Sequence, residues 1–112
     1  MSAPEHITII GAGLGGALMA CHLAKTGYRV ALYERMPDPR AKGFVGGRSI
    51  NLAISARGIA ALREVGLADD VLQAAIPMPG RMIHPRPPHA GLHFQAYSND
   101  PNDGINSVSR SQ

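Results

Sequence analysis

The sequence is poor in cysteine and in aromatic side chains. Cys21 is the sole cysteine, which excludes an internal disulfide and a zinc site built from several cysteines. A single thiol is typical of a reducing compartment, so we expect a cytoplasmic protein. There is no tryptophan, and aromatic residues make up 4% of a chain that is 45% hydrophobic. Small aliphatic side chains must therefore supply the core.

The sequence also lacks a strong excess of charge of one sign and a long membrane-type segment. The 11 Lys and Arg residues only weakly exceed the 8 Asp and Glu residues and are scattered along the chain, which argues against a nucleic acid partner. Residues 7–24 are almost uncharged, but glycines interrupt this stretch and Glu5, not a basic residue, precedes it. We therefore expect no membrane segment. A length of 112 residues fits one domain or part of one.

The first third of the chain has the pattern of a β-α-β unit. His6–Ile10 is a β-branched run typical of a strand buried on both faces. Leu14–Thr26 has apolar residues at helical spacing, and Gly27 follows where a left-handed residue often ends a helix. Tyr28–Tyr33 is a second apolar strand. The order predicts an α/β fold with a parallel sheet, in which the crossover is right-handed.

A glycine turn joins the first strand to the helix. Gly11, Gly13 and Gly16 match the G-x-G-x-x-G dinucleotide-binding pattern, and Gly15 adds a further glycine. The pattern requires a tight turn at the first glycine, backbone approach to a pyrophosphate at the second and close helix–strand packing at the third. Glu34 ends the second strand 23 positions after Gly11, where an acid can accept hydrogen bonds from a ribose. An acid here argues against NADP in this site.

The remaining residues are predicted to alternate between short elements and loops. Residues 35–47 are rich in proline, glycine and charge and should form a loop, and we expect Ile7, Ile9, Leu32 and Leu52 to share one sheet. Ser55 is a plausible N-cap. Further along the chain we expect an extended segment over 49–54, helices over 56–65 and 68–75, edge strands with loops after Pro77, and a strand over 105–109.

Three blocks resemble a known family. They are Gly47–Ser55, Ile76–His84 and Ser107–Arg110. With the glycine turn, they are similar in sequence and order to the kynurenine 3-monooxygenase family of FAD-dependent aromatic hydroxylases. The resemblance implies that residues 1–112 are an incomplete, N-terminal part of an FAD-binding domain, with a substrate-contacting segment beginning near residues 77–112. A chain of this extent should be inactive alone.

The resemblance also implies cofactors and residue roles. FAD would be bound and NADPH would be the co-substrate, with oxygen activated on the flavin and one atom transferred to the ring of L-kynurenine to give 3-hydroxykynurenine. Arg81 and Tyr97 would bind the substrate carboxylate. No side chain need act as a catalytic nucleophile. The implied flavin contacts are Gly11, Gly13, Gly15, Gly16, Tyr33, Glu34, Arg35, Met36, Ala53 and Arg110.

Other interpretations stay open from the residues alone. The chain could belong to another FAD-dependent aromatic hydroxylase, to an NAD-dependent oxidoreductase with the same opening, or to a non-catalytic nucleotide-binding module. Arg81 could be a solvated arginine and Tyr97 a packing residue. Arg48 could neutralise a pyrophosphate or pair with Glu34. The histidines after residue 83 lack the spacing of a metal site.

Overall fold

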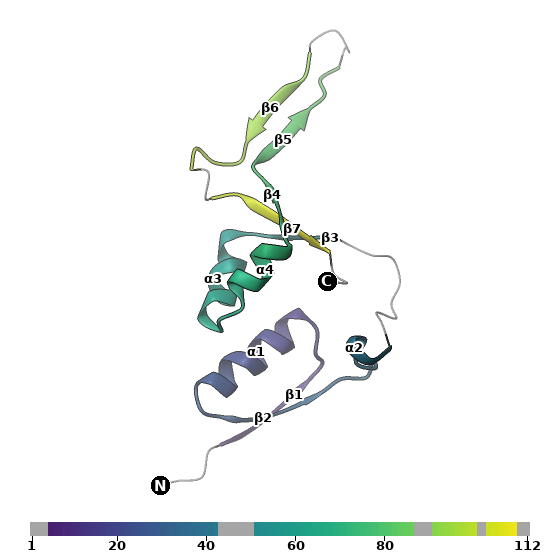
Figure 1. The fold of residues 1–112 in the computed structure, drawn as a ribbon, viewed down its shortest axis with the longest axis vertical. Helices are drawn as coiled ribbons and strands as arrows, with labels where there is room; N and C mark the ends of the chain where they lie inside the picture. Colours follow the sequence, from purple (N-terminus) through teal and green to yellow (C-terminus); the bar gives the residue numbers. More distant parts are fainter. Residues whose placement is uncertain (1–4, 43–50, 87–90, 101–102, 110–112) are drawn as a thin grey trace.

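A computed structural model describes residues 5–42, 51–86, 91–100 and 103–109 (Figure 1). The glycine turn joins the first strand of a parallel pair to the helix that connects the two strands, and the later residues form antiparallel strands and short helices. In chain order the elements are β1 (His6–Ile10), α1 (Leu14–Lys25), β2 (Arg29–Tyr33), α2 (Pro39–Lys42), β3 (Asn51–Ile54), α3 (Ala56–Glu64), α4 (Ala68–Ala74), β4 (Ile76–Met78), β5 (Gly80–Ile83), β6 (His93–Ala96) and β7 (Ile105–Ser109).

The predicted β-α-β unit is confirmed. β1 and β2 are parallel, and Ile7 faces Val30 while Ile9 faces Leu32. Helix α1 connects them and contacts both strands. Gly27, just after the helix, has a φ of 98°, the left-handed conformation that a residue with a side chain rarely adopts.

β3, β7 and β4 form a separate antiparallel sheet, in that order. The expectation that Leu52 shares a sheet with Ile7, Ile9 and Leu32 is therefore wrong, because Leu52 faces Val108 of β7 instead. A short apolar strand gives no signal for its partner, and here its partner is the predicted strand at 105–109. That strand is confirmed.

Helices α3 and α4 pack against each other and against the antiparallel sheet. Ser55 is at the N-cap position of α3 as predicted, but its side chain makes no capping hydrogen bond. Ile59 and Ala68, from the two helices, are the buried hydrophobic residues among those described, at 8% and 3% exposed. Lys25 of α1 donates from Nζ to the carbonyl oxygen of Glu64 at 2.7 Å, which links α1 to α3.

The predicted loop after β2 contains one helical turn, α2, which the sequence reading missed. Asp38 precedes it, and its Oδ1 accepts a hydrogen bond from the backbone N–H of Arg40 at 2.9 Å. The guanidinium of Arg40 also pairs with this carboxylate, with Nη2 2.7 Å from Oδ2. This ion pair lowers the pKa of Asp38 to about 2.

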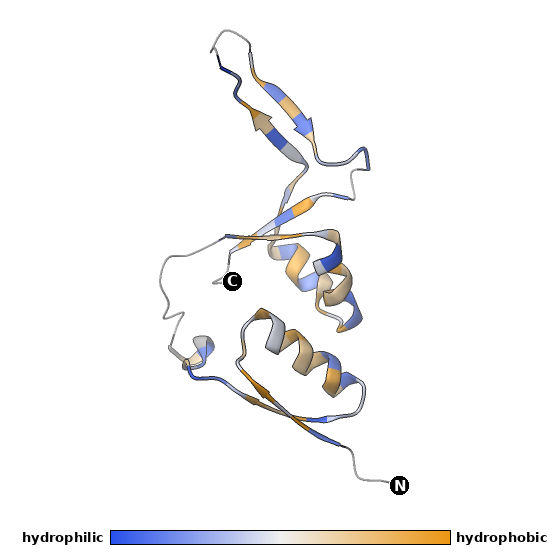
Figure 2. Ribbon diagram, turned by 180° about the vertical axis from the view of Figure 1, so that it is seen from behind, coloured by the Kyte–Doolittle hydropathy of each residue, from blue (hydrophilic) through white to orange (hydrophobic). Residues whose placement is uncertain are grey.

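β5 and β6 form an antiparallel hairpin that extends from the rest of the chain (Figure 1). The described residues span 70 × 32 × 22 Å with a radius of gyration of 18.9 Å. A compact domain of this length would have a radius of gyration of about 13 Å. Figure 2 shows apolar residues along β1, β2 and the hairpin. Helix α1 packs on β1 and β2, whereas the hairpin lies away from the described helices. None of the described helices is long and apolar enough to cross a membrane.

Candidate dinucleotide site

The glycine turn lies at the carboxyl end of β1, directly beside the end of β2. The N–H of Gly11 donates to the carbonyl oxygen of Tyr33 at 2.7 Å, so the turn begins where the strand pairing ends. Gly11 has a φ of 98°, which confirms the tight turn expected there. The first intrahelical bond of α1 runs from Ala17 N–H to Gly13 at 2.9 Å. The N–H groups of the residues just before Ala17 lack intrahelical acceptors, and such groups at a helix N-terminus can bind an anion.

Gly13 and Gly16 have different surroundings. A Cβ at Gly13 would meet no atom within 4 Å, so the missing side chain leaves open space beside the helix N-terminus. A Cβ at Gly16 would overlap the carbonyl oxygen of Gly11 and approach the Ile9 side chain at 3.6 Å. Gly16 therefore permits the helix to pack on the strand, which is the role that the sequence pattern assigned to the third glycine. At Gly13 the open space is compatible with the approach of a pyrophosphate, and that role stays a prediction.

Glu34 extends from the end of β2 to the glycine turn. Its Oε2 accepts a hydrogen bond from Ala12 N–H at 2.7 Å, and its Oε1 accepts one from Met36 N–H at 2.8 Å. These bonds to Met36 and then Ala12 stabilise the charged form and lower the pKa of Glu34. A carboxylate has about four acceptor positions, so it can accept further hydrogen bonds from ribose hydroxyls without losing these two.

The other predicted flavin contacts divide into three groups. Tyr33, Arg35 and Met36 flank Glu34 and are exposed beside the turn. Ala53 lies in β3 of the antiparallel sheet, opposite Ser107, and not with the glycine turn. Arg110 lies outside the described residues, as does Arg48, so their roles stay predictions. The residues around the turn suit a phosphate and a ribose: an open position at Gly13, helix N–H donors and a charged acceptor at Glu34.

The two predicted substrate residues lie together on the hairpin. Arg81 faces Gln95 across β5 and β6. Tyr97 donates its N–H to the Pro79 carbonyl at 3.0 Å, which continues the pairing by one residue pair beyond β6. Arg81 and Gln95 are cross-strand partners and share one face of the hairpin, and Tyr97 lies in the bend directly after β6. Tyr97 is 45% exposed.

The sequence reading missed Gln95. Its Oε1 accepts a hydrogen bond from Arg81 Nε at 2.7 Å. The signal available in the sequence was the spacing of two residues between Gln95 and Tyr97, which in a continuous strand places both on one face. That signal says nothing about the strand opposite, and so could not pair Gln95 with Arg81.

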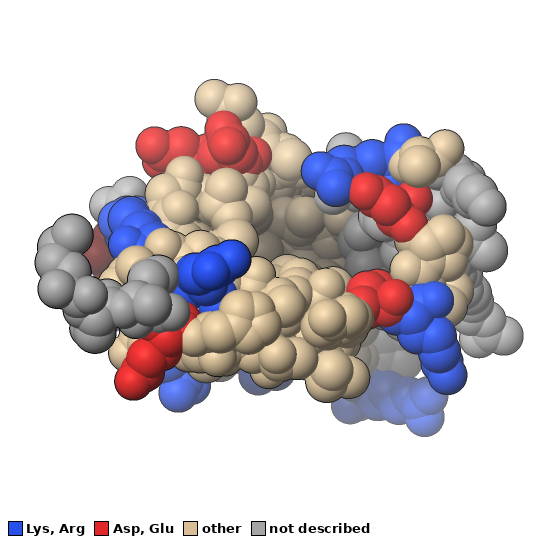
Figure 3. Space-filling model, turned by 90° about the horizontal axis from the view of Figure 1, so that it is seen from below, with Lys and Arg blue, Asp and Glu red and all other residues tan. Residues whose placement is uncertain are grey.

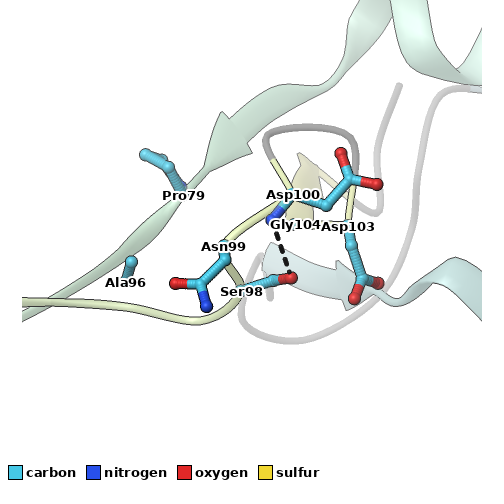
Figure 4. Close-up of a pocket in the computed structure, with 7 residues that line it drawn as sticks. All are labelled: Pro79, Ala96, Ser98, Asn99, Asp100, Asp103 and Gly104. Atoms are coloured by element: carbon cyan, nitrogen blue, oxygen red, sulfur yellow. Dashed lines mark hydrogen bonds between the residues drawn. The ribbon is translucent and has the colours of Figure 1, made fainter.

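A small pocket lies at the base of the hairpin (Figure 4). The turn after β6 lines it, and Ser98 Oγ accepts a hydrogen bond from Asp100 N–H at 3.1 Å. The remaining lining residues are Pro79, Ala96, Asn99, Asp103 and Gly104. Within the described ranges, no group of three or more His, Cys, Asp and Glu residues could hold a metal ion. On the face seen in Figure 3, basic and acidic side chains lie in several separate places, with no continuous basic area.

Two solved structures with a similar fold are named as oxygenases. A tetrameric 2-methyl-3-hydroxypyridine-5-carboxylic acid oxygenase matches with a TM-score of 0.75 at 18% identity, over 98% of this chain and 27% of that one. The p-nitrophenol 4-monooxygenase PnpA of Pseudomonas putida DLL-E4 matches with a TM-score of 0.63 at 24% identity, over 98% and 27%. Residues 9–62 match the NAD(P)-binding Rossmann-like domain family. The fold is thus α/β, with a Rossmann-like β-α-β unit within residues 9–62.

Relatives with similar sequences indicate a more specific family than the fold does. Kynurenine 3-monooxygenase of Myxococcus xanthus (strain DK1622) is 53% identical over 106 residues, which are 95% of this chain and 22% of that protein. Kynurenine 3-monooxygenase of Stenotrophomonas maltophilia (strain K279a) is 47% identical over 109 residues, 97% of this chain and 24% of that protein. The resemblance is confirmed: the chain is homologous to a part of the kynurenine 3-monooxygenases, spanning about a quarter of their length.

Proposed function

We propose that this chain is the N-terminal, FAD-binding part of a monooxygenase that converts L-kynurenine to 3-hydroxykynurenine, with NADPH, H⁺ and O₂ consumed and NADP⁺ and water formed. The observation that carries the proposal is the placement of Glu34 against the glycine turn, in a chain 53% identical to a kynurenine 3-monooxygenase. In this proposal residues 1–112 supply most of the dinucleotide site and begin the substrate site near residues 77–112.

The turn residues hold the cofactor. Backbone N–H groups at the start of α1 bind the pyrophosphate, Gly13 allows its close approach, and Glu34 accepts hydrogen bonds from the ribose. Tyr33, Arg35 and Met36 line the same edge, and Ala53 and Arg110 complete the contacts. Bound flavin supplies the reduction and oxygen chemistry. The side chains of this chain bind and orient, and no side chain need act as a nucleophile.

Arg81 and Tyr97 bind the carboxylate of L-kynurenine. The two terminal nitrogens of Arg81, Nη1 and Nη2, make no hydrogen bond to another described residue, so they can grip both carboxylate oxygens. Tyr97, whose backbone N–H bonds to Pro79 next to β5, adds a directed hydroxyl donor. The carboxylate contact holds the substrate in one orientation, which is the contribution that positioning makes to such a reaction.

A chimaera tests the proposal directly. Residues 1–112 replace the matching segment of the Myxococcus xanthus relative, and the purified protein is assayed for bound FAD, for NADPH oxidation that depends on L-kynurenine, and for 3-hydroxykynurenine. We expect non-covalent FAD and product formation. A chimaera that folds and retains FAD, yet hydroxylates no kynurenine, would contradict the proposed substrate. A folded chimaera without FAD would contradict the cofactor.

Arg81→Ala in this chimaera tests the substrate contact. A charge-assisted bidentate bond contributes about 2 kcal/mol or more, so KM for L-kynurenine should rise roughly 30-fold or more while FAD content stays normal. Arg81→Lys should recover only part of the loss, because an ammonium cannot reproduce the guanidinium fork. Arg63→Ala, at an exposed position in the last turn of α3, is the control. An unchanged KM, or loss of flavin, would show that the assignment of Arg81 is wrong.

A further inference from the structure

We propose that Gln95 is a positioning residue: its amide oxygen orients the Arg81 guanidinium so that Nη1 and Nη2 face an incoming carboxylate. This inference rests on the proposed function, in which Arg81 binds the substrate carboxylate. It adds a residue that the glycine motif and the family blocks do not contain. The observation behind it is the 2.7 Å hydrogen bond from Arg81 Nε to Gln95 Oε1.

The hairpin places the two side chains opposite each other. Arg81 and Gln95 are cross-strand partners, and such partners have Cβ atoms only about 5 Å apart. A long arginine side chain loses considerable freedom when it binds a ligand. The bond at Nε fixes the plane of the guanidinium before any ligand arrives, so less freedom remains to be lost on binding.

The choice of nitrogen matters for what Arg81 can still bind. The bond uses Nε and leaves the terminal pair, Nη1 and Nη2, which form a fork that matches a carboxylate. A neutral amide also leaves the positive charge uncompensated, and no salt-bridge partner for Arg81 is present among the described residues. An acid at position 95 would hold the same nitrogen but would compete with the ligand for the charge.

The opposite face of the hairpin keeps this register. A Cβ at Gly80 would lie 2.6 Å from Phe94 Cζ and 2.9 Å from the Cα of Ala96, so the Phe94 ring covers the bare backbone of the facing strand. Met82 faces Phe94 on the same side. A slip of one residue would move every side chain to the other face, and this contact opposes it. Arg81 and Gln95 therefore stay paired.

Two substitutions at position 95 test the inference in the chimaera. Gln95→Met keeps the length of the side chain and removes the acceptor, and we expect KM for L-kynurenine to rise about 3- to 10-fold with kcat within about two-fold. Gln95→Glu keeps the acceptor, and KM should rise at least as much, because the new carboxylate competes for Arg81. A role limited to hairpin stability would instead be rescued by Glu.

A kynurenine analogue without the carboxylate separates positioning from folding. Its KM or dissociation constant should be the same, within about two-fold, in wild type, Gln95→Met and Gln95→Glu. The control is Gln73→Met, the same change at an exposed position of α4. In a double-mutant cycle, Gln95→Met should add little to Arg81→Ala.

The contrary results are distinct. If Gln95→Met leaves KM for L-kynurenine unchanged, or raises it equally for the analogue without the carboxylate, Gln95 does not position Arg81. If the wild-type chimaera hydroxylates no kynurenine at all, the proposed function fails first, and the inference fails with it.

Discussion

Gly13 and Gly16 are three residues apart in one turn, yet an added methyl group would meet different surroundings at each. We predict that Gly13→Ala leaves the stability of the flavin-free chimaera within about 0.5 kcal/mol of wild type, because its backbone is in an ordinary region and the space is open. Flavin binding should be lost, because the methyl group occupies the path of the pyrophosphate. Absorbance of bound flavin and thermal unfolding check the two statements.

Gly16→Ala should differ from Gly13→Ala in thermal stability. Its Cβ would overlap the Gly11 carbonyl oxygen, and overpacking of this kind costs about 1–3 kcal/mol. The flavin-free protein should therefore unfold at a lower temperature. Gly15→Ala, where a Cβ meets nothing within 4 Å, serves as the control for stability. Normal flavin retention in Gly13→Ala would contradict the assignment of Gly13 to the cofactor.

Glu34 leads to a prediction about how the stability of the protein depends on pH. Its folded-state pKa is lowered from the ordinary value of 4.5, first by the Met36 N–H bond and then by the Ala12 N–H bond. The stabilisation is therefore complete above the unfolded-state pKa and is lost as the pH falls through the lowered value. In thermal unfolding of the flavin-free chimaera, the difference between wild type and Glu34→Gln should be constant near neutral pH and shrink below about pH 4.5. A difference that grows on acidification would contradict the assignment.

The elements show how far the sequence carries the fold. β1, α1 and β2 were predictable because their apolar runs are adjacent and separated by glycines in left-handed turns. α2 could have been found, since Asp38 before Pro39 is a start signal for a helix. The partner of β3 could not be predicted, because the pattern of a short apolar strand does not specify which strand it pairs with, and its partner lies more than fifty residues later. Gln95 was missed because nothing in its own strand specifies which residue it faces on the neighbouring strand.

The hairpin as an element depends on Gly80. A side chain there would overlap the Gln95 carbonyl oxygen and contact the Phe94 ring, so Gly80→Val should disturb the pairing of β5 and β6. We expect a raised KM for L-kynurenine with normal flavin content, because the glycine turn lies in another sheet. Gly104→Ala, where the nearest atom is 3.6 Å from the added Cβ, is the control. Equal effects at both positions would argue against a specific role of the hairpin.

The whole molecule leaves much apolar surface uncovered. Ile10 is 80% exposed, Leu14 71% and Ile76 69%, and few described residues are buried. Contiguous exposed apolar surface and unpaired strand edges favour association. We predict that the 112-residue chain expressed alone aggregates or stays partly unfolded, as size-exclusion chromatography and thermal unfolding would report. A monomer with a cooperative transition would show that these residues form a self-sufficient domain.

The position of β7 between β3 and β4 has a consequence for synthesis on the ribosome. His6 faces Arg29, 23 residues later, so the parallel pair has both of its strands early. Leu52 faces Val108, 56 residues later, and β4 pairs with the same strand. β3 and β4 do not pair with each other, and both pair with β7. Until residues 105–109 have been translated, neither strand has its partner. The nascent chain thus contains the complete β-α-β unit with its glycine turn before it can close the sheet from which the hairpin extends.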